Sequence, residues 1–258
     1  MKKIVSLVVA ALVMCSCADS FLSEEPVGEF MPEQVESEEN IEGIVIGAYA
    51  VLDGYYASDA INSGCSNWQF GDVVSDDAYK GGGGTGDQNQ IHLMEIFNAN
   101  PTGIDFEARW AALYEGVKRC NQAIRLLSNS TVKNKEQRLA EMRFLRGHYY
   151  FNLKVIYNLI PWIDETVVDP NEYHTKSNME FTSDQLWEKI LGEFSAAYQV
   201  LPESQSDYGR PTKMAAKAYM AKVYLYQSKW KECLSACDEV IQSGKYTLYP
   251  DFLSLIHI

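Results

Sequence analysis

Positive charge is scarce in this chain. Its 258 residues hold 22 lysine and arginine residues against 35 aspartate and glutamate residues, which gives a formal net charge of −13 at pH 7. Proteins that bind nucleic acid or anionic lipid through charge need a basic surface, so the composition argues against both as ligands. The chain is nevertheless long enough to bury a sizeable hydrophobic core, as one large domain or two small ones.

Long hydrophobic runs are also scarce, and the one at the N-terminus is too short to span a bilayer. It extends from Ile4 to Met14, is broken only by Ser6, and follows the basic residues Lys2 and Lys3. This pattern is typical of a secretory signal peptide. We therefore predict that residues 1–16 are a signal peptide, and that the mature chain is more acidic still.

The cysteine that follows the signal peptide is predicted to carry the lipid anchor. In Met14-Cys15-Ser16-Cys17, a small residue precedes Cys17 whereas the bulky Met14 precedes Cys15, so Cys17 fits a lipobox better. An acylated (palmitate-type) cysteine holds a soluble domain on a membrane without a spanning helix. The alternatives are an ordinary signal peptide with incidental cysteines, or a cleaved core helix.

Patterns for metal binding and catalysis are missing. The sequence has no CxxC pair, no HExxH, no Gly-x-Ser-x-Gly elbow, and its glycine run at 81–86 lacks the Lys-Ser/Thr ending of a phosphate-binding loop. We predict no enzyme activity, no cofactor and no metal. Calcium held by acidic residues near the glycines remains a minor alternative, because their spacing does not fit an EF-hand: Asp72, Asp76, Asp77 and Asp87.

Apolar residues at helical spacing are abundant after residue 37. They predict helices over about 38–56, 106–127, 133–158, 183–200, 212–227 and 230–243. The last two form a pair with small residues on the first helix and Trp230 opening the second, which resembles a tetratricopeptide helix–turn–helix. We predict an all-α fold of tetratricopeptide-like helix pairs. Residues 17–36 are predicted to be an extended tether, and 57–103 an irregular, loop-rich region in which a small hairpin is left open.

Several segments together resemble the SusD/RagB family of outer-membrane nutrient-binding lipoproteins. They occur in family order along residues 17–252: Cys17–Pro26, Gly47–Leu52, Trp110–Ile124, Ala140–Phe151, Asn158–Trp162, Gly209–Tyr219 and Trp230–Tyr246. The resemblance implies a SusD-like helical domain over 37–258 with a loop-rich ligand-binding insertion. It also implies a lipid-anchored protein of the outer membrane, facing the cell surface, that partners a SusC-like TonB-dependent transporter barrel.

The family's usual ligand is a glycan, although some members capture peptides. The resemblance therefore implies non-catalytic capture of an oligosaccharide, of the starch or glycan type, and its delivery to the transporter. Family members normally continue beyond the point where this chain stops after Tyr249-Pro-Asp-Phe-Leu-Ser. We therefore expect this chain to be the N-terminal portion of a longer family pattern.

The irregular region supplies the residue types that a sugar needs. Sugars stack their apolar faces on aromatic rings and pair their hydroxyls with amides or carboxylates. The candidate ligand-binding residues are Trp68, Asp76, Asp77, Tyr79, Phe97, Asn98 and Asn100. For each ring, packing within the loop region is an equal alternative, and a solvated or capping role is favoured over a catalytic dyad for the adjacent Asp76 and Asp77.

Two further functions remain to be weighed. A glycoside hydrolase needs two convergent carboxylates, which adjacent residues on an extended chain do not provide. A tetratricopeptide scaffold would bind a protein partner through its helix concavity. Polar residues inside the helices, namely Asn121, Arg143, Arg146 and His148, are predicted to have structural roles rather than to bind a ligand.

Overall fold

The computed structural model describes residues 38–54 and 67–248. The predicted signal peptide, the tether, Cys17 and the first part of the irregular region lie outside the described residues. The elements in chain order are α3 (Glu38–Tyr49), η2 (Ala50–Asp53), η3 (Trp68–Asp72), α4 (Asn89–Glu95), α5 (Ile104–Asn129), α6 (Lys135–Tyr157), α7 (Pro170–Tyr173), α8 (Ser183–Val200), α9 (Lys213–Tyr226) and α10 (Trp230–Gln242).

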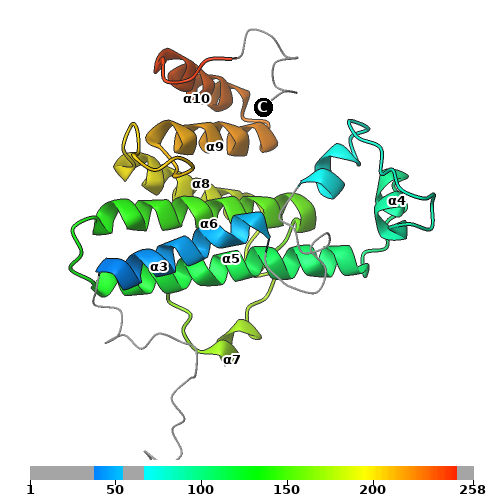
Figure 1. The fold of residues 1–258 in the computed structure, drawn as a ribbon, viewed down its shortest axis with the longest axis horizontal. Coiled ribbons are helices and arrows are strands. Elements are labelled where there is room, and N and C mark those ends of the chain that lie inside the picture. The colour runs from blue at the N-terminus through cyan, green and yellow to red at the C-terminus, as the bar shows by residue number, and fades with distance from the viewer. Residues whose placement is uncertain (1–37, 55–66, 249–258) are drawn as a thin grey trace, which may run out of the picture. The chain divides into compact units, whose positions relative to one another are not determined.

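The long helices pack in the order of the chain. Helix α6 lies between α5 and α8, α9 packs on α8, and α10 packs on α9, while α3 lies against α5 and α6 (Figure 1). Each helix contacts mainly its sequence neighbours, as expected for a stack of helix pairs. The predicted all-α fold is therefore confirmed, and residues 67–103 form short helices and loops in place of the hairpin left open above.

Local signals set the ends of these helices where the sequence predicted them. Thr182 and Gln185 form a capping box that begins α8, since each side chain bonds the backbone N–H of the other. The Thr212 hydroxyl accepts a hydrogen bond from the N–H of Ala215 and so begins α9. Helix α6 ends at Tyr157, and the next residue, Asn158, leaves the helical conformation with a φ of 62° before Pro161.

Two glycines allow the central helices to approach closely. A Cβ added at Gly116 on α5 would lie 2.6 Å from ring atoms of Tyr149 on α6, and one at Gly147 would lie 2.9 Å from the Phe194 ring on α8. The Tyr149 ring is fully buried, and its hydroxyl donates to the carbonyl of Ala48 at 2.8 Å. The contacts that join α3, α5, α6 and α8 therefore depend on the absence of side chains at these two positions.

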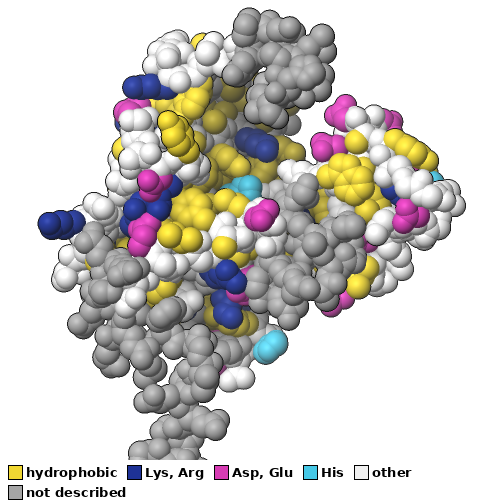
Figure 2. Space-filling view, in the orientation of Figure 1, with side chains coloured by type: hydrophobic (Ala, Val, Ile, Leu, Met, Phe, Trp, Pro, Cys, Tyr) yellow, Lys and Arg dark blue, Asp and Glu magenta, His cyan; other side chains and the backbone are white. Residues whose placement is uncertain are grey.

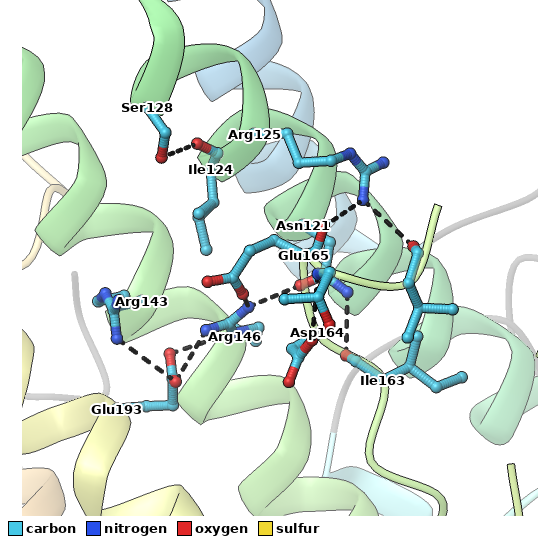
Figure 3. A network of polar contacts seen from close by, with 12 residues as sticks. Asn121, Ile124, Arg125, Ser128, Arg143, Arg146, Ile163, Asp164, Glu165 and Glu193 are labelled. Atoms are coloured by element: carbon cyan, nitrogen blue, oxygen red, sulfur yellow. Dashed lines mark hydrogen bonds and ion pairs between the residues drawn. The ribbon is translucent and has the colours of Figure 1, made fainter. Parts of the chain in front are cut away.

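A buried ion network fixes the middle of the stack. The Arg146 guanidinium on α6 donates to both carboxylate oxygens of Glu193 on α8, at 3.1 and 2.8 Å, and to the carboxylate of Glu165 (Figure 3). It also donates to Asn121 on α5 at 2.8 Å. Arg143 reaches the same Glu193 only at 3.8 Å. The predicted structural role is confirmed for Asn121 and Arg146, whereas Arg143 is partly exposed and makes only this longer contact.

The described cysteines are free thiols. Cys120 is buried, and burial raises the pKa of its thiol well above the ordinary value. Cys233 and Cys237 are both half-buried on α10 and unbridged, as their one-turn spacing predicts. Cys65 lies outside the described residues.

Among residues 38–54 and 67–248, no helix combines the length and the apolar character that a bilayer crossing requires.

Candidate functional site

The predicted ligand-binding residues lie around the two short helices of the irregular region. Trp68 opens η3, Tyr79 follows the turns after it, and Phe97 comes just after the end of α4. The backbone N–H of Lys80 donates to the carboxylate of Glu95 at 3.4 Å, so residues 79–80 run beside the last turn of α4. The structure therefore brings Tyr79 near the segment that carries Phe97.

Two of the candidate rings face solvent. Tyr79 is 75% exposed and Phe97 is 76% exposed, whereas Trp68 is half-buried. Ile96, at 51% exposed, is a third exposed hydrophobic side chain of this region. Figure 2 shows hydrophobic side chains on the part of the molecule that carries α4. Packing within the loop region, the alternative for each ring, thus does not account for Tyr79 or Phe97.

The exposure of Phe97 follows from the backbone that ends α4. The N–H of Phe97 donates to the carbonyl of Met94 at 3.0 Å, and the N–H of Asn98 to the carbonyl of Leu93 at 2.8 Å. These are the two bonds of a Schellman motif, in which the residue at the Phe97 position is usually glycine because φ is positive. Phe97 has a φ of 55°, an uncommon conformation for a bulky side chain.

The adjacent carboxylates do not form a catalytic pair. Asp76 and Asp77 are both exposed, and the Asp77 carboxylate accepts a hydrogen bond from the Ser75 hydroxyl at 3.1 Å. Asp76 has a φ of 65° and takes up the turn after η3. The described part of the chain holds no cluster of three His, Cys, Asp or Glu side chains arranged for a metal. The favoured interpretation was a solvated or capping role, and the exposure of both side chains agrees with a solvated one.

The two candidate amides differ in what they have left to offer a ligand. The side-chain carbonyl of Asn100 accepts from the backbone N–H and the hydroxyl of Thr102, at 3.1 and 2.9 Å, and so is used within the loop. The side chain of Asn98 is exposed beside Phe97. Asn98 is therefore the better placed of the two to bond a sugar hydroxyl.

A buried lysine organises the glycine run. Lys80 is only 8% exposed, and its ammonium donates to the carbonyl of Gly84 at 3.0 Å and to the carbonyl of Asp87. The Asp87 carboxylate in turn accepts from the N–H of Gly83 at 3.0 Å. The sequence predicted only an irregular, loop-rich region here, and the structure shows carbonyl groups in and beside the run bonded to a cation supplied by the chain itself.

A second buried cation, which sequence reasoning missed, ties the loop region to the helices. Arg109 on α5 is fully buried and donates to the side-chain carbonyls of Asn67, at 2.8 Å, and Asn152, at 3.3 Å. Its guanidinium also lies 5.5 Å from the centre of the Phe70 ring. Arg109 therefore positions η3, which begins with Trp68, against α5 and α6. The role of Arg109 could have been predicted from its place as a cation on the apolar face of a predicted helix.

The polar chain continues from Asn152 to His148. The His148 ring lies 2.7 Å from the Tyr219 hydroxyl on α9. Desolvation of the ring, reinforced by the charges of Arg109 and Lys222, lowers the pKa of His148 from 6.5 to about 4. His148 is therefore neutral at pH 7 and joins α6 to α9, in agreement with the predicted structural role.

A cavity of about 350 Å³ lies between α5 and the chain that follows α6, and no residue of 67–103 lines it. Its walls include Trp110, Tyr114 and Lys118 of α5, with Pro161 and Tyr173 opposite. None of the predicted ligand-binding residues lines it. The candidate loop site is therefore an exposed surface of rings and amides, and the cavity is a separate feature of the helical stack.

Comparison with known proteins agrees with the fold and with the motifs. A family model for SusD-like proteins, described as "Starch-binding associating with outer membrane", matches residues 20–225. The curated SusD-like protein P2 of Formosa agariphila is 25% identical over 97% of this chain and 49% of its own length. A SusD-like protein of Bacteroides ovatus is 25% identical over 88% of this chain and 40% of its own length. The chain thus spans about half the length of the curated relatives it matches.

Solved structures give the same answer. Surface glycan-binding protein A from Bacteroides thetaiotaomicron, in complex with laminarihexaose, is 29% identical, with a TM-score of 0.70 over 84% of this chain and 46% of that one. A laminarin-binding SusD-like protein is 27% identical, with a TM-score of 0.68 over 80% of this chain and 43% of that one. Since the family match covers most of the sequence and the helical stack is shared, the chain belongs to the SusD-like (SusD/RagB) family.

Proposed function

We propose that this chain serves in the non-catalytic capture of an oligosaccharide at the cell surface. The observation that carries the proposal is the likeness to the surface glycan-binding protein whose structure holds laminarihexaose, at 29% identity and a TM-score of 0.70. Laminarihexaose is the ligand in the structure of that relative. For this chain we propose only the ligand class, an oligosaccharide, and the titration described below identifies the sugar.

The exposed rings of the loop region are the proposed contact surface. Tyr79 and Phe97 are largely exposed, so the apolar face of a sugar ring can reach them and stack on them. Asn98 beside Phe97, and Asp76 and Asp77 after η3, offer polar partners for hydroxyl groups. Trp68 is half-buried at the start of η3 and offers less of its ring to a ligand, and Asn100 contributes mainly by shaping the loop.

A binding role fits this geometry better than hydrolysis. Retaining and inverting glycosidases both hold two carboxyl groups on either side of one glycosidic bond. Here Asp77 is engaged by Ser75 and Asp76 occupies a turn, so the two do not converge on a common point. We therefore propose that the protein releases its ligand unchanged.

The proposed site is tested by titrating the protein with laminarihexaose, maltohexaose and a hexapeptide by isothermal calorimetry. Each of Tyr79→Ala and Phe97→Ala is expected to lower the affinity for the oligosaccharide by roughly five- to tenfold. This is the equivalent of losing a stacking contact of about 1 kcal/mol. Tyr208→Ala is the matched control, since Tyr208 is a fully exposed tyrosine outside the loop region. Binding of the hexapeptide alone would support the peptide-capturing alternative, and binding of none would refute capture of either class.

We also propose that Cys17 is the acylated residue that anchors the protein in the outer membrane, facing the cell surface. This proposal rests on the signal-peptide pattern and on Ser16 before Cys17. Cys17→Ala is expected to move the protein from the membrane fraction to the soluble fraction, and Cys15→Ala to leave it with the membrane. The reverse outcome would assign the anchor to Cys15.

Delivery to a SusC-like TonB-dependent barrel is the last part of the proposal. It is supported by family membership, because a lipid-anchored capture protein needs a route for its ligand across the outer membrane. Affinity purification of the tagged protein from its native membrane is expected to retain a barrel protein. Retention of an unrelated soluble protein, with no barrel, would favour the scaffold alternative.

A further inference from the structure

Hydrogen bonds within the chain fix the walls of the cavity on α5. The Tyr114 hydroxyl donates to the carbonyl of Pro161 at 2.7 Å, and the Asn121 amide donates to the carbonyl of Ile163 at 2.9 Å. The Tyr150 hydroxyl lies 2.7 Å from both the carbonyl and the N–H of Ile163. These bonds fix the two walls relative to each other, and Figure 3 shows Asn121 and Ile163 within the same network as Arg146.

Aromatic rings form much of the lining. The Trp110 and Tyr114 ring centres lie 4.7 Å apart, and Tyr157 packs edge-on against Trp110 at 4.9 Å, so the indole is held in one orientation. Part of Trp110 remains exposed, as does part of Tyr173 on the opposite wall. A flat, partly apolar ligand therefore has a fixed ring to stack on.

Among the charged side chains at the rim of the cavity, one positive charge has no carboxylate among the described residues to compensate it. Glu115 is paired with Arg119 at 2.9 Å, so these two charges compensate each other. Lys118 is exposed and has no ion-pair or hydrogen-bond partner within residues 38–54 and 67–248. In a protein with a formal charge of −13, an uncompensated ammonium beside an aromatic cavity favours a ligand that carries a negative charge.

The dimensions favour a compact ligand over an extended peptide. The cavity volume of about 350 Å³ is near the lower limit of small-molecule pockets, which span ~300–1,000 Å³. The backbone groups of Pro161 and Ile163 that line it are already bonded, so a peptide strand would find no free row of partners there. One or two ring-shaped units suit it better.

We propose that this cavity binds a uronic acid unit of an acidic saccharide, with its carboxylate on Lys118 and the face of the neighbouring sugar unit on Trp110, since the two residues are about 12 Å apart along α5. The paired Glu115 carboxylate is then available to accept bonds from the sugar hydroxyls. The site is separate from the exposed rings of the loop region, and it does not depend on the function proposed for them.

The test is a fluorescence and calorimetric titration of the full chain with digalacturonic acid, with cellobiose as the neutral sugar and N-acetyltyrosine as a ring-bearing carboxylate of peptide type. Digalacturonic acid is expected to bind saturably, with a dissociation constant on the order of millimolar, as for a small ligand with one charged contact. Lys118→Gln is expected to weaken it about five- to tenfold, and Lys133→Gln, an exposed lysine on the α5–α6 loop, to leave it unchanged.

The outcomes separate this site from the loop site. Retention of digalacturonic acid binding in Tyr79→Ala and Phe97→Ala supports the cavity, and loss of binding in these variants overturns it. Equal affinity for cellobiose, tighter binding of N-acetyltyrosine, no saturable binding, or an unchanged affinity in Lys118→Gln would each overturn the proposal. Since Lys118 is exposed, its substitution leaves the packing of α5 intact.

Discussion

Replacement of Arg146 by methionine should be among the most destabilising single changes in the helical stack. The Arg146 side chain is only 3% exposed and that of its main partner Glu193 only 7%. Removing the guanidinium leaves the Glu193 carboxylate buried without a counter-charge, and it also strips bonds from Asn121 and Glu165. Breaking one side of a buried ion pair costs about 3–5 kcal/mol, so we expect Arg146→Met to lower the free energy of unfolding by that amount.

The same helix provides a control for this prediction. Arg143 reaches Glu193 at 3.8 Å, and its side chain is 39% exposed, so Arg143→Met should cost less than about 1 kcal/mol. The double variant Arg146→Met/Glu193→Leu removes the orphaned charge as well. It should recover about 2 kcal/mol or more of the loss, because an apolar pair of similar volume often replaces a buried ion pair at little cost.

Urea unfolding followed by circular dichroism at 222 nm measures all three variants. The reasoning is refuted if Arg146→Met loses less than about 1 kcal/mol, or if the double variant is no more stable than the single one.

Unfolding at acid pH offers a second check through Glu165. Burial alone would raise the pKa of Glu165, but the Arg146 charge and hydrogen bond outweigh it, so the pKa lies below the ordinary 4.5. This stabilisation is present above pH 4.5 and lost as the pH falls through the lowered pKa, and it should be absent from Arg146→Met.

Three further predictions, with four substitutions, test other parts of the structure by the same unfolding assay or by hydrogen exchange. Gly116→Ala should destabilise by ~1–3 kcal/mol, because its Cβ would lie 2.6 Å from the Tyr149 ring, whereas Gly192→Ala on α8 has open space and should stabilise by up to about 1 kcal/mol. Since the folded protein keeps His148 neutral down to pH 4, stability should fall as the pH drops from 6.5 to 4, by at most ~1.4 kcal/mol per pH unit, and His148→Gln should remove that slope. Phe97→Gly should slow hydrogen exchange at the end of α4, because glycine adopts a φ of 55° without strain, while it weakens oligosaccharide binding. Unchanged stability, an unchanged pH slope, or faster exchange would contradict these expectations in turn.

The sequence predicted the long helices well because several local signals agreed at each of them. The apolar spacing, the cap residues Thr182 and Thr212, and the stop at Asn158–Pro161 each act on residues only a few positions away in the sequence. Helix α4 was missed because it has only seven residues, begins after the left-handed Gln88, and lies next to the glycine run. A helix this short is held by tertiary contacts, which periodicity does not report.

The candidate site was less predictable from the sequence for a related reason. Ring and amide residue types pointed to the loop region as a candidate site, but the exposure of those side chains depends on backbone turns that have no simple pattern. Phe97 faces solvent because of a Schellman motif that more often holds glycine. The roles of Lys80 and Arg109 required the fold, since each is a cation that the chain surrounds with partners far along the sequence or within a loop.

The buried ammonium of Lys80 has a consequence for how the loop region behaves in different media. A loop of carbonyl groups gathered around a dissociable ion keeps its order only while the ion is supplied from outside. Here the positive charge is covalently attached to the loop it holds, four residues from the carbonyl of Gly84 and seven from that of Asp87. Its effective concentration is therefore set by the chain and not by the surroundings, and the path of the glycine run should be the same in dilute and in ion-rich medium.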